Sequence, residues 1–310
     1  MYKYVIKRLI VTIPILIGVT FIVFTIMAMA PGDPGRQILG FNARQEAVDM
    51  LNEELGYNRP FLVRYVSYMS NVIFRLDFGL SYRTQRPVFD EIWARFPNTL
   101  ALALLSVAFS SVIGVVLGLV SAVKQYSATD NIFTVLAMFF ASIPAFWLGM
   151  NLILIFSLYL GWFPTSGTGS WQHFVLPVIT ISLGGMGGLL RLTRSTMLET
   201  IRQDYIRTAR AKGQTNRMVI WKHALKNALM PIITVIATSF GALLGGTIIT
   251  ETVFSVPGLG THVVSAIRHR DVPVVMSTTI FLATLFCLIM LITDIIYAFI
   301  DPRVRAKYSK

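Results

Sequence analysis

The chain carries little charge and almost no cysteine. Only 14% of its 310 residues are charged and 55% are hydrophobic, whereas a soluble domain carries roughly 25% charged residues. Cys287 is the single cysteine, so a disulfide framework and a cysteine-based metal site are excluded. The four histidines lack metal-ligand spacing such as His-Glu-x-x-His and fall on three polar connections: His173, His223, His262 and His269. This composition points to a membrane protein without a metal centre.

Nucleotide-binding and catalytic motifs are also lacking. A P-loop requires Gly-x-x-x-x-Gly-Lys-Ser/Thr, whose backbone N–H groups and lysine hold phosphates, and the sequence contains none. The tripeptide Asp77-Phe78-Gly79 resembles a kinase fragment but has no accompanying kinase motif. An intramembrane hydrolase would need a base within the spans, and no histidine lies deep in one. We expect no catalysis by this chain and no cofactor bound to it.

The sequence does contain long uncharged runs. They cover Leu9–Pro31, Phe96–Val123, Asn131–Leu190, Asn227–Thr250 and Val272–Thr293. A membrane-spanning helix needs about 20 mostly apolar residues, and the third run is long enough for two, separated by a glycine- and serine-rich turn after Gly161. The sequence therefore predicts an all-α membrane protein with six spanning helices, near residues 9–30, 98–123, 131–160, 174–194, 227–250 and 272–298.

Charge placement predicts the orientation. Residues 191–226 hold nine basic and two acidic residues, and the two tails are also basic. Residues 32–95 hold eight of each sign. Because basic connections stay in the cytoplasm, we expect both termini and residues 195–226 there, with 301–310 as a cytoplasmic tail. The net charge of +12 is then a topology signal with some attraction to anionic membrane lipid, and not a nucleic-acid footprint.

The long connection before the second span predicts an extracytoplasmic amphipathic segment. Asn42 is a candidate cap for a helix that Gly56 stops, and Pro60 a candidate start for a second helix. The second helix would place apolar and aromatic residues on one face: Leu62, Tyr65, Val66, Met69, Val72 and Ile73. Two interpretations are compatible, an interfacial cap over the spans and a docking surface for an external partner. Residues 1–97 thus form one predicted region and 98–300 a five-helix region.

Several spans carry candidates for close packing or bending. Glycine pairs four residues apart permit helices to approach closely: Gly114/Gly118, Gly184/Gly188 and Gly241/Gly245. Pro144, Pro177 and Pro231 are hinge candidates, although such prolines are more often kinks tolerated by packing. Asp294 is the one acid well inside an apolar run; a structural ion pair is favoured there over a proton or substrate role.

The basic loop contains a short cationic helix pattern that ends at a glycine. Its residues are Asp204, Tyr205, Ile206, Arg207, Thr208, Ala209, Arg210, Ala211, Lys212 and Gly213. A membrane protein rarely keeps a long polar loop between two spans unless something docks there. The two alternatives are a docking helix and a loop that only fixes topology.

That run, followed by His223-Ala-Leu-Lys-Asn-Ala-Leu-Met-Pro231, resembles the cytoplasmic loop of the dipeptide, oligopeptide and nickel family of ABC-importer permeases. Further matches extend along nearly the whole chain: Ala30-Pro-Gly-Asp-Pro34, Asp77-Phe-Gly-Leu-Ser81, Glu251-Thr-Val-Phe-Ser-Val-Pro-Gly-Leu-Gly260 and Asp294-Ile-Ile-Tyr-Ala-Phe-Ile-Asp-Pro-Arg303. The general importer pattern opens with Glu-Ala-Ala, where this chain has Arg207-Thr-Ala209. The peptide-type permeases share this variant.

The resemblance implies a type I importer fold and a division of labour. A second, related permease chain would complete the pathway, two cytoplasmic ATP-binding subunits would hold ATP and magnesium, and an external binding protein would deliver substrate. Asp204 to Gly213 would dock on an ATPase subunit and couple its closure to alternating access, with Ala209 and Ala211 small enough for close contact. The expected cargo is short peptides in a prokaryotic inner membrane. Glutathione or nickel transport, a non-transporting scaffold and an ATP-independent transporter are the alternatives.

Overall fold

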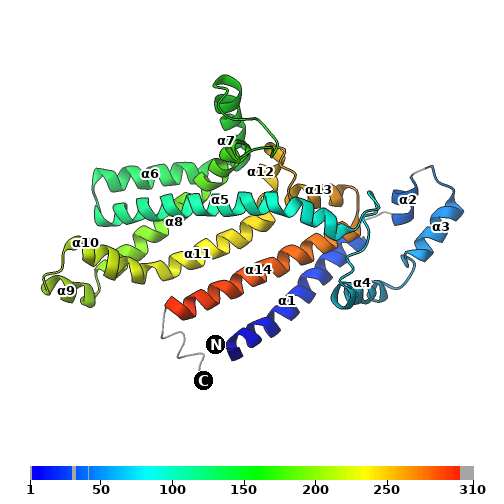
Figure 1. The fold of residues 1–310 in the computed structure, drawn as a ribbon, viewed down its shortest axis with the longest axis horizontal. Coiled ribbons are helices and arrows are strands. Elements are labelled where there is room, and N and C mark those ends of the chain that lie inside the picture. The colour runs from blue at the N-terminus through cyan, green and yellow to red at the C-terminus, as the bar shows by residue number, and fades with distance from the viewer. Residues whose placement is uncertain (1, 30–32, 41, 301–310) are drawn as a thin grey trace. The chain divides into compact units, whose positions relative to one another are not determined.

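The computed structural model describes residues 2–29, 33–40 and 42–300, with side chains for all of these except 2–5, 7–9 and 297–300. The predicted cytoplasmic tail lies outside them. The described chain is helical apart from turns, loops and one isolated bridge between Leu80 and Pro87, so the predicted all-α class is confirmed (Figure 1). The helices are α1 (Tyr2–Met29), α2 (Pro34–Leu39), α3 (Gln45–Glu54), α4 (Phe61–Arg75), α5 (Val88–Val123), α6 (Ala128–Ser142), α7 (Ala145–Leu152), η1 (Ile153–Tyr159), α8 (Gln172–Ile201), α9 (Asp204–Ala211), α10 (Asn216–Met218), η2 (Val219–Ala224), α11 (Leu225–Gly246), α12 (Ile248–Val253), α13 (Leu259–Arg268) and α14 (Val272–Ile300).

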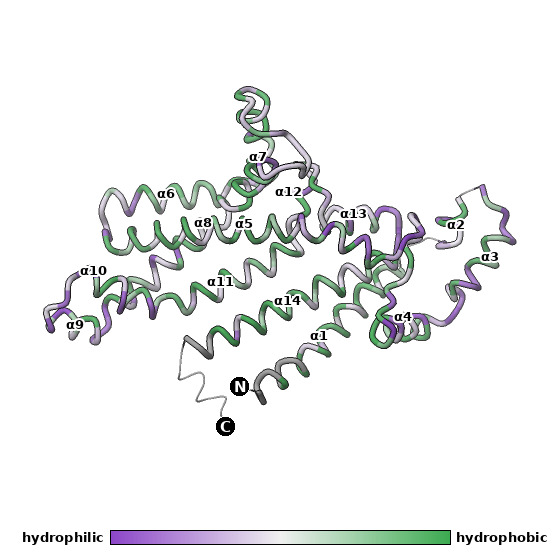
Figure 2. The backbone as a smooth tube through the Cα atoms, in the orientation of Figure 1, coloured by the Kyte–Doolittle hydropathy of each residue, from purple (hydrophilic) through white to green (hydrophobic). Residues whose placement is uncertain are grey.

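Among the described residues, five helices are long and apolar enough to cross a membrane: α1 from Ile10, α5, α8, the continuous helix Asn216–Gly246, and α14. A sixth span is reached when α6 and the helix that follows it are counted together. Figure 2 shows the hydrophobic character of these helices and the hydrophilic character of the segment around α9 and α10. The predicted count of six therefore depends on one broken span.

That break corrects the prediction of a single helix near residues 131–160. The two halves, Ala128–Ser142 and Ala145–Tyr159, meet at an angle of 97°. Ile143 has an extended backbone (ψ 126°) and Pro144 follows it as the N-cap of α7. Proline lacks the N–H that would continue the helix and disfavours helical geometry in the residue before it. Pro177 and Pro231, by contrast, lie inside α8 and α11, which continue past them.

The chain divides into two compact units. One contains Leu100–Val256 together with residues 289–300, and its centre is the contact of α8 with α5 and α6. A Cβ atom on Gly118 would lie 2.6 Å from the Leu190 carbonyl oxygen, and one on Gly187 would lie 2.5 Å from the Ala137 carbonyl oxygen. Such distances allow only glycine. The predicted Gly114/Gly118 contact is confirmed, with Gly114 also against α8.

The predicted Gly184/Gly188 pair is not a close contact within this chain. A Cβ on either residue would meet nothing within 4 Å. The glycine of α8 that approaches α6 is Gly187, one residue before Gly188, on another face of the helix. The glycine spacing correctly predicted that α8 has small residues for a close helix contact, but it did not predict which face of α8 makes that contact.

These contacts predict opposite outcomes for two glycine-to-alanine substitutions. Gly118→Ala inserts a methyl group between α5 and α8, and overpacking of this kind costs about 1–3 kcal/mol. Gly188→Ala adds a methyl group where there is open space. We expect thermal unfolding of the purified chain in detergent to show a lower midpoint for Gly118→Ala and an unchanged midpoint for Gly188→Ala. Equal midpoints would contradict the close approach of α5 and α8.

The second unit contains Tyr2–Thr99 and Pro257–Leu288, and in it α4 packs against α1. The Tyr65 ring lies edge-on to Phe21, with centroids 5.3 Å apart, and its hydroxyl lies 2.8 Å from Thr20 Oγ1. Gly56 ends α3 in a left-handed conformation (φ 68°), as predicted, but the N-cap of α3 is Arg44 and not Asn42.

The predicted apolar face of α4 is divided. Tyr65 and Val72 are buried, whereas Leu62, Val66 and Ile73 are exposed. The two groups lie on different strips of the helix: Tyr65 contacts α1, and the other strip is exposed in the part of the chain that the structure describes. The sequence pattern therefore correctly predicted an amphipathic helix, but only some of its apolar residues are buried.

A polar cluster joins the segment before α5 to α13 and the start of α14 in the same unit. Ser81 Oγ donates to Asp271 Oδ2 at 2.5 Å, and Thr84 Oγ1 donates to Glu91 Oε1 at 2.6 Å. His262 Nε2 lies 3.2 Å from Glu91 Oε2, at an angle that makes no hydrogen bond. Burial, followed by the neighbouring Arg95 cation, lowers the pKa of His262 from 6.5 to about 4.

The shift of His262 predicts a pH dependence of stability. Below pH 6.5 the unfolded chain protonates His262, while the folded chain keeps it neutral until about pH 4. Its contribution is therefore complete above pH 6.5 and is lost as the pH falls toward 4. We expect His262→Gln to flatten the fall of the unfolding midpoint between pH 6.5 and 4. His269→Gln, at an exposed position on the same segment, serves as the control and should retain the wild-type slope.

Candidate functional site

The helix α9 has well-defined ends. Asp204 occupies its first turn, where a negative charge interacts favourably with the helix dipole. At the other end, Gly213 has φ 76°, its N–H donates to the Arg210 carbonyl at 3.0 Å, and Gln214 N–H donates to the Ala209 carbonyl at 3.3 Å. This pair of bonds is the Schellman motif, which favours glycine at that position. The predicted glycine stop is thereby confirmed.

One face of α9 is buried in the chain's own core. Ile206 is fully buried and Ala209 is 8% exposed. They belong to a hydrophobic cluster, the α9 seat, contributed by α5, α8, η2 and α11: Leu119, Ala122, Met197, Val219, Ile220, Ala224 and Ala228. Burying an isoleucine side chain stabilises a structure by about 1.5–3 kcal/mol. The packing of α9 is therefore shared with the ends of these helices.

A hydrogen bond adds a polar link between α9 and α11. The Asn227 side-chain amide donates to the Tyr205 hydroxyl at 2.9 Å and also to the His223 carbonyl at 3.0 Å. Between α9 and α11 the backbone passes through the π-helical turn η2, a feature often found at functional sites. Tyr205 is 43% exposed, so its ring also forms part of the outer surface of α9.

The outer face of α9 is cationic and solvent-exposed. It carries Arg207, Thr208, Arg210, Ala211 and Lys212. Arg207 lies 3.6 Å from Asp204, but both side chains are largely exposed, and such pairs contribute little stability. Ala209, predicted to permit close docking, instead points into the α9 seat. Of the two alanines, only Ala211 lies on the face that a partner would contact.

Behind the α9 seat lies a buried ion pair. Arg194 of α8 donates from Nε to Asp130 Oδ1 and from Nη2 to Asp130 Oδ2, both at 2.7 Å. Asp130 is 2% exposed, and its carboxylate also accepts hydrogen bonds from Ser121 Oγ and from Tyr126 N–H. Every carboxylate lone-pair direction thus has a donor. The bidentate geometry fixes the α5–α6 turn to α8.

Sequence reasoning missed this ion pair. Arg194 is one of the nine cations counted in residues 191–226, and its partner Asp130 lies 64 residues away in the sequence. The local signal was Ser127, whose hydroxyl accepts from Asp130 N–H at the start of α6. A carboxylate directly after a helix cap is common, and nothing in the sequence indicates its distant partner.

The remaining candidates lie outside the α9 seat. Pro144, Pro177 and Pro231 are distributed over the α6–α7 break, α8 and α11. Asp294 is half-buried in α14, and its role stays a prediction. Within the described ranges, no three His, Cys, Asp or Glu side chains come together in a way that would hold a metal ion.

Comparison with known proteins gives matches over the whole chain. Residues 114–306 match the family described as "binding-protein-dependent transport system inner membrane component", and residues 1–103 match the model for the N-terminal part of the membrane component of such systems. The chain is 41% identical to the dipeptide transport system permease protein of Alkalihalophilus pseudofirmus, covering 98% of this chain and all of that protein. It is also 41% identical to the glutathione transport system permease protein of Escherichia coli, covering 99% of this chain and all of that protein.

A solved structure shares the fold. A chain of the MetNI methionine ABC transporter, in an inward-facing conformation, superposes with a TM-score of 0.59 and 21% identity, over 70% of this chain and 99% of that one. At this identity the likeness concerns the fold alone. It confirms the predicted type I importer permease fold.

The ion pair behind the α9 seat predicts a large loss of stability when one partner is removed. Arg194→Ala leaves a buried carboxylate without its cation, and breaking a buried pair costs about 3–5 kcal/mol. We expect a markedly lower unfolding midpoint in detergent. Arg207→Ala removes an exposed pair of the same residue types and should leave the midpoint unchanged. Equal midpoints for Arg194→Ala and wild type would show that the pair is not formed.

Proposed function

We propose that this chain imports short peptides. The premise is that it belongs to the family of binding-protein-dependent transport system inner membrane components. It is a multi-pass inner-membrane protein and an ABC importer permease. The observation that carries the proposal is the similarity at 41% identity over essentially the full length to a dipeptide permease. That match includes the loop that contains α9 and all the helices long enough to span the membrane.

The energy source is proposed to be a pair of ATP-binding subunits on the cytoplasmic side. This chain has no P-loop, so ATP and magnesium would bind to those partners. The cationic outer face of α9 supports α9 as the docking element, because Arg207, Arg210 and Lys212 are solvent-exposed and would face the carboxylates of a cleft, with Arg207 held only by an exposed pair with Asp204. A second, related permease chain and an external binding protein complete the proposed assembly.

Coupling would proceed through the α9 seat. Ile206 and Ala209 are packed against the ends of α5, α8 and α11, and the Asp130–Arg194 pair joins α8 to the α5–α6 turn. When the ATPase subunits close, a shift of α9 would therefore tilt these helices together. Such tilting of packed elements is the usual basis of alternating access.

The proposed substrate is a short peptide, and glutathione is the alternative with direct support. The dipeptide and glutathione permeases share the same identity with this chain, and glutathione is itself a small peptide with free carboxylates. Uptake measured with a labelled dipeptide, in competition with unlabelled dipeptide, glutathione and nickel, distinguishes the three. A non-transporting scaffold predicts no uptake, and an ATP-independent transporter predicts uptake without ATP.

Two substitutions on opposite faces of α9 test the docking assignment. Ala211→Trp places a bulky ring on the exposed face, so we expect it to abolish ATP-dependent peptide uptake in vesicles and co-purification of the ATPase subunits, with an unchanged unfolding midpoint. Ala209→Trp would be forced into the α9 seat and should instead lower the midpoint.

Ala211→Ser is the matched control, because it changes the same position with little change in size, and it should behave as wild type. Normal coupling and normal ATPase co-purification in Ala211→Trp would contradict docking on α9. Uptake by wild type of none of the three substrates would contradict the transport proposal while leaving the docking result interpretable.

A further inference from the structure

A cationic cavity lies beside α4, in the unit that contains α1 and α4. Its volume is about 190 Å³, and none of its lining residues is acidic. Arg59 and Arg64 line it together with Tyr57, Tyr68 and Tyr82. Since a water molecule occupies about 30 Å³ of the liquid, such a volume has room for at least about six of them. The cavity is therefore large enough for part of an organic molecule and not only for a single ion.

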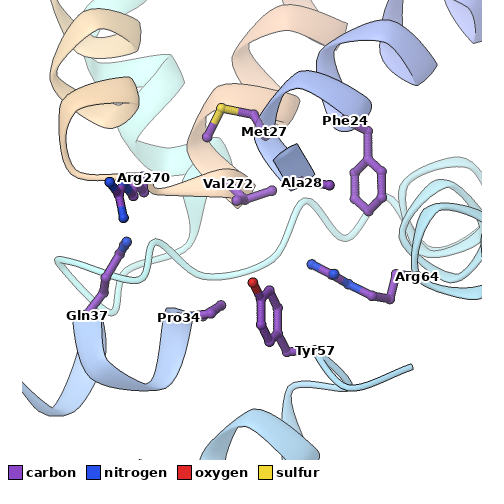
Figure 3. Close-up of a pocket in the computed structure, with 9 residues that line it drawn as sticks. All are labelled: Phe24, Met27, Ala28, Pro34, Gln37, Tyr57, Arg64, Arg270 and Val272. Carbon is purple, nitrogen blue, oxygen red and sulfur yellow. The ribbon is translucent and has the colours of Figure 1, made fainter. Parts of the chain in front are cut away.

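The guanidinium group of Arg64 is held in place by aromatic rings. Its central carbon lies 4.3 Å from the Tyr57 ring centroid and 5.8 Å from that of Phe24. Figure 3 shows Arg64 reaching in from α4 between these two rings, with Arg270 on the opposite side of a smaller adjoining pocket. That pocket shares Phe24, Tyr57 and Arg64 with the larger cavity. Stacking leaves the N–H groups at the edge of the guanidinium plane available to a ligand.

Arg59 and Arg270 add further positive charge. The Arg59 side chain folds back over Gly56, so that a Cβ on Gly56 would lie 3.3 Å from Arg59 Nε. None of the three arginines forms an ion pair or a side-chain hydrogen bond with another residue that the structure describes. Burial raises the pKa of Tyr82 to about 12, so that its hydroxyl remains a neutral hydrogen-bond donor. The cavity therefore offers donors and positive charge, the chemistry that recognises an anion.

The cavity also has an apolar side, which selects the kind of anion. Phe24, Leu55, Val272 and Pro273 complete this part of the lining. Sites for organic ligands combine apolar contact with a few polar groups that fix the orientation, whereas an inorganic anion gains nothing from apolar contact. A planar guanidinium matches the geometry of a carboxylate. The lining therefore suits a carboxylate that is attached to an apolar body.

The exposed apolar strip of α4 lies away from the cavity. Leu62, Val66 and Ile73 form this strip, on the face of α4 opposite to Arg64 and Tyr68, as the helical period of 3.6 residues requires. A lipid with its phosphate in the cavity could therefore not lay its acyl chains along the strip. A small carboxylate needs no such surface.

The side of the membrane supports a transported anion. Residues 32–95 form the connection that charge placement predicts to be extracytoplasmic, and the cavity residues from Leu55 to Tyr82 all belong to it. An importer receives its substrate on this side. The substrate proposed above, a short peptide, carries a free carboxylate at its C-terminus.

We infer that this cavity binds the C-terminal carboxylate of a short peptide. Arg59 and Arg64 would hold the two carboxylate oxygens, and the apolar side would contact the last side chain of the peptide. Because no lining residue is acidic, the amino end of the peptide is not recognised there. The inference deepens the proposed function and rests on it, and it concerns this unit alone.

The test compares dialanine with two derivatives of it. The assembled transporter, without its binding protein and in nanodiscs of phosphatidylcholine, is titrated with each, and binding is followed by microscale thermophoresis. We expect saturable binding of dialanine, a similar Kd for N-acetyl-dialanine, and no binding of dialanine amide. Equal binding of dialanine and its amide would overturn the inference, as would the absence of saturable binding.

Substitutions then locate the site. Arg64→Ala should raise the Kd for dialanine about tenfold or more, because hydrogen bonds between charged partners are among the strongest in proteins. Arg64→Lys keeps the charge but not the planar fork, so its Kd should be intermediate. Arg75→Ala is the matched control, because Arg75 ends α4 but does not line the cavity. A wild-type Kd in Arg64→Ala, or in Arg64→Lys where the alanine variant does not fold, would overturn the inference.

Competition distinguishes the sources of the anion. Inorganic phosphate at the same concentration should leave dialanine bound, because phosphate makes no use of the apolar side. Displacement by phosphate would identify a free-phosphate site. Loss of dialanine binding in nanodiscs that contain phosphatidylglycerol would identify a lipid headgroup site. Either result would overturn the carboxylate assignment.

ATP-driven uptake by the complete system separates this inference from the proposed function. Uptake of dialanine by wild type, combined with no saturable binding to the transporter alone, would contradict the cavity assignment and leave the proposed function standing. Absence of uptake of any short peptide would contradict the proposed function itself.

Discussion

The buried pair of Asp130 and Arg194 is the contact on which the geometry around α9 depends. A carboxylate that is 2% exposed is tolerated only when charge and hydrogen bonds compensate its removal from water. Here the compensation is complete, since the guanidinium, a serine hydroxyl and a backbone N–H converge on the two oxygens. Because these donors come from α8, from the end of α5 and from the α5–α6 turn, the pair holds α5, α6 and α8 in one arrangement.

The short helix α9 gains its position from that arrangement. An isolated eight-residue helix is not stable in water, because nucleation costs more than so few hydrogen bonds return. Ile206 and Ala209 therefore have to be buried against Met197 and Leu119, whose helices the ion pair fixes. The same burial divides α9 into an inner face that belongs to the membrane domain and an outer cationic face that is open to a partner.

Local features of the sequence were enough to predict most elements. Gly213 marked the end of α9 because its left-handed conformation is a property of one residue, and the apolar runs marked the spans because length and composition decide them. Pro144 is a hinge candidate from the sequence, yet the 97° bend was not foreseen, since other prolines such as Pro177 and Pro231 lie inside helices that continue past them. The proline's effect depends on whether neighbouring helices leave room for the chain to turn.

Contacts between residues far apart in the sequence could not be predicted from local features. Arg194 looked like one more loop cation, because its identity as a buried partner is set by a residue on another helix. Ala209 looked like a docking residue, because small size serves equally well for contact with a partner and for burial in the chain's own core. The choice among Gly184, Gly187 and Gly188 likewise depends on the rotation of α8 about its axis, which the presence of glycine does not specify.

The glycine contacts and the ion pair together determine how motion would pass through the first unit. Gly118 brings α5 against the Leu190 carbonyl, and Gly187 brings α8 against the Ala137 carbonyl, so these backbones have no side chains between them to deform. Close-packed interiors shift as bodies and do not compress. A displacement of α9 would then be transmitted to α5, α6 and α8 as a unit. We predict that the relative movement is taken up where the described helices are interrupted, at Pro144 between α6 and α7 and at Thr247 between α11 and α12.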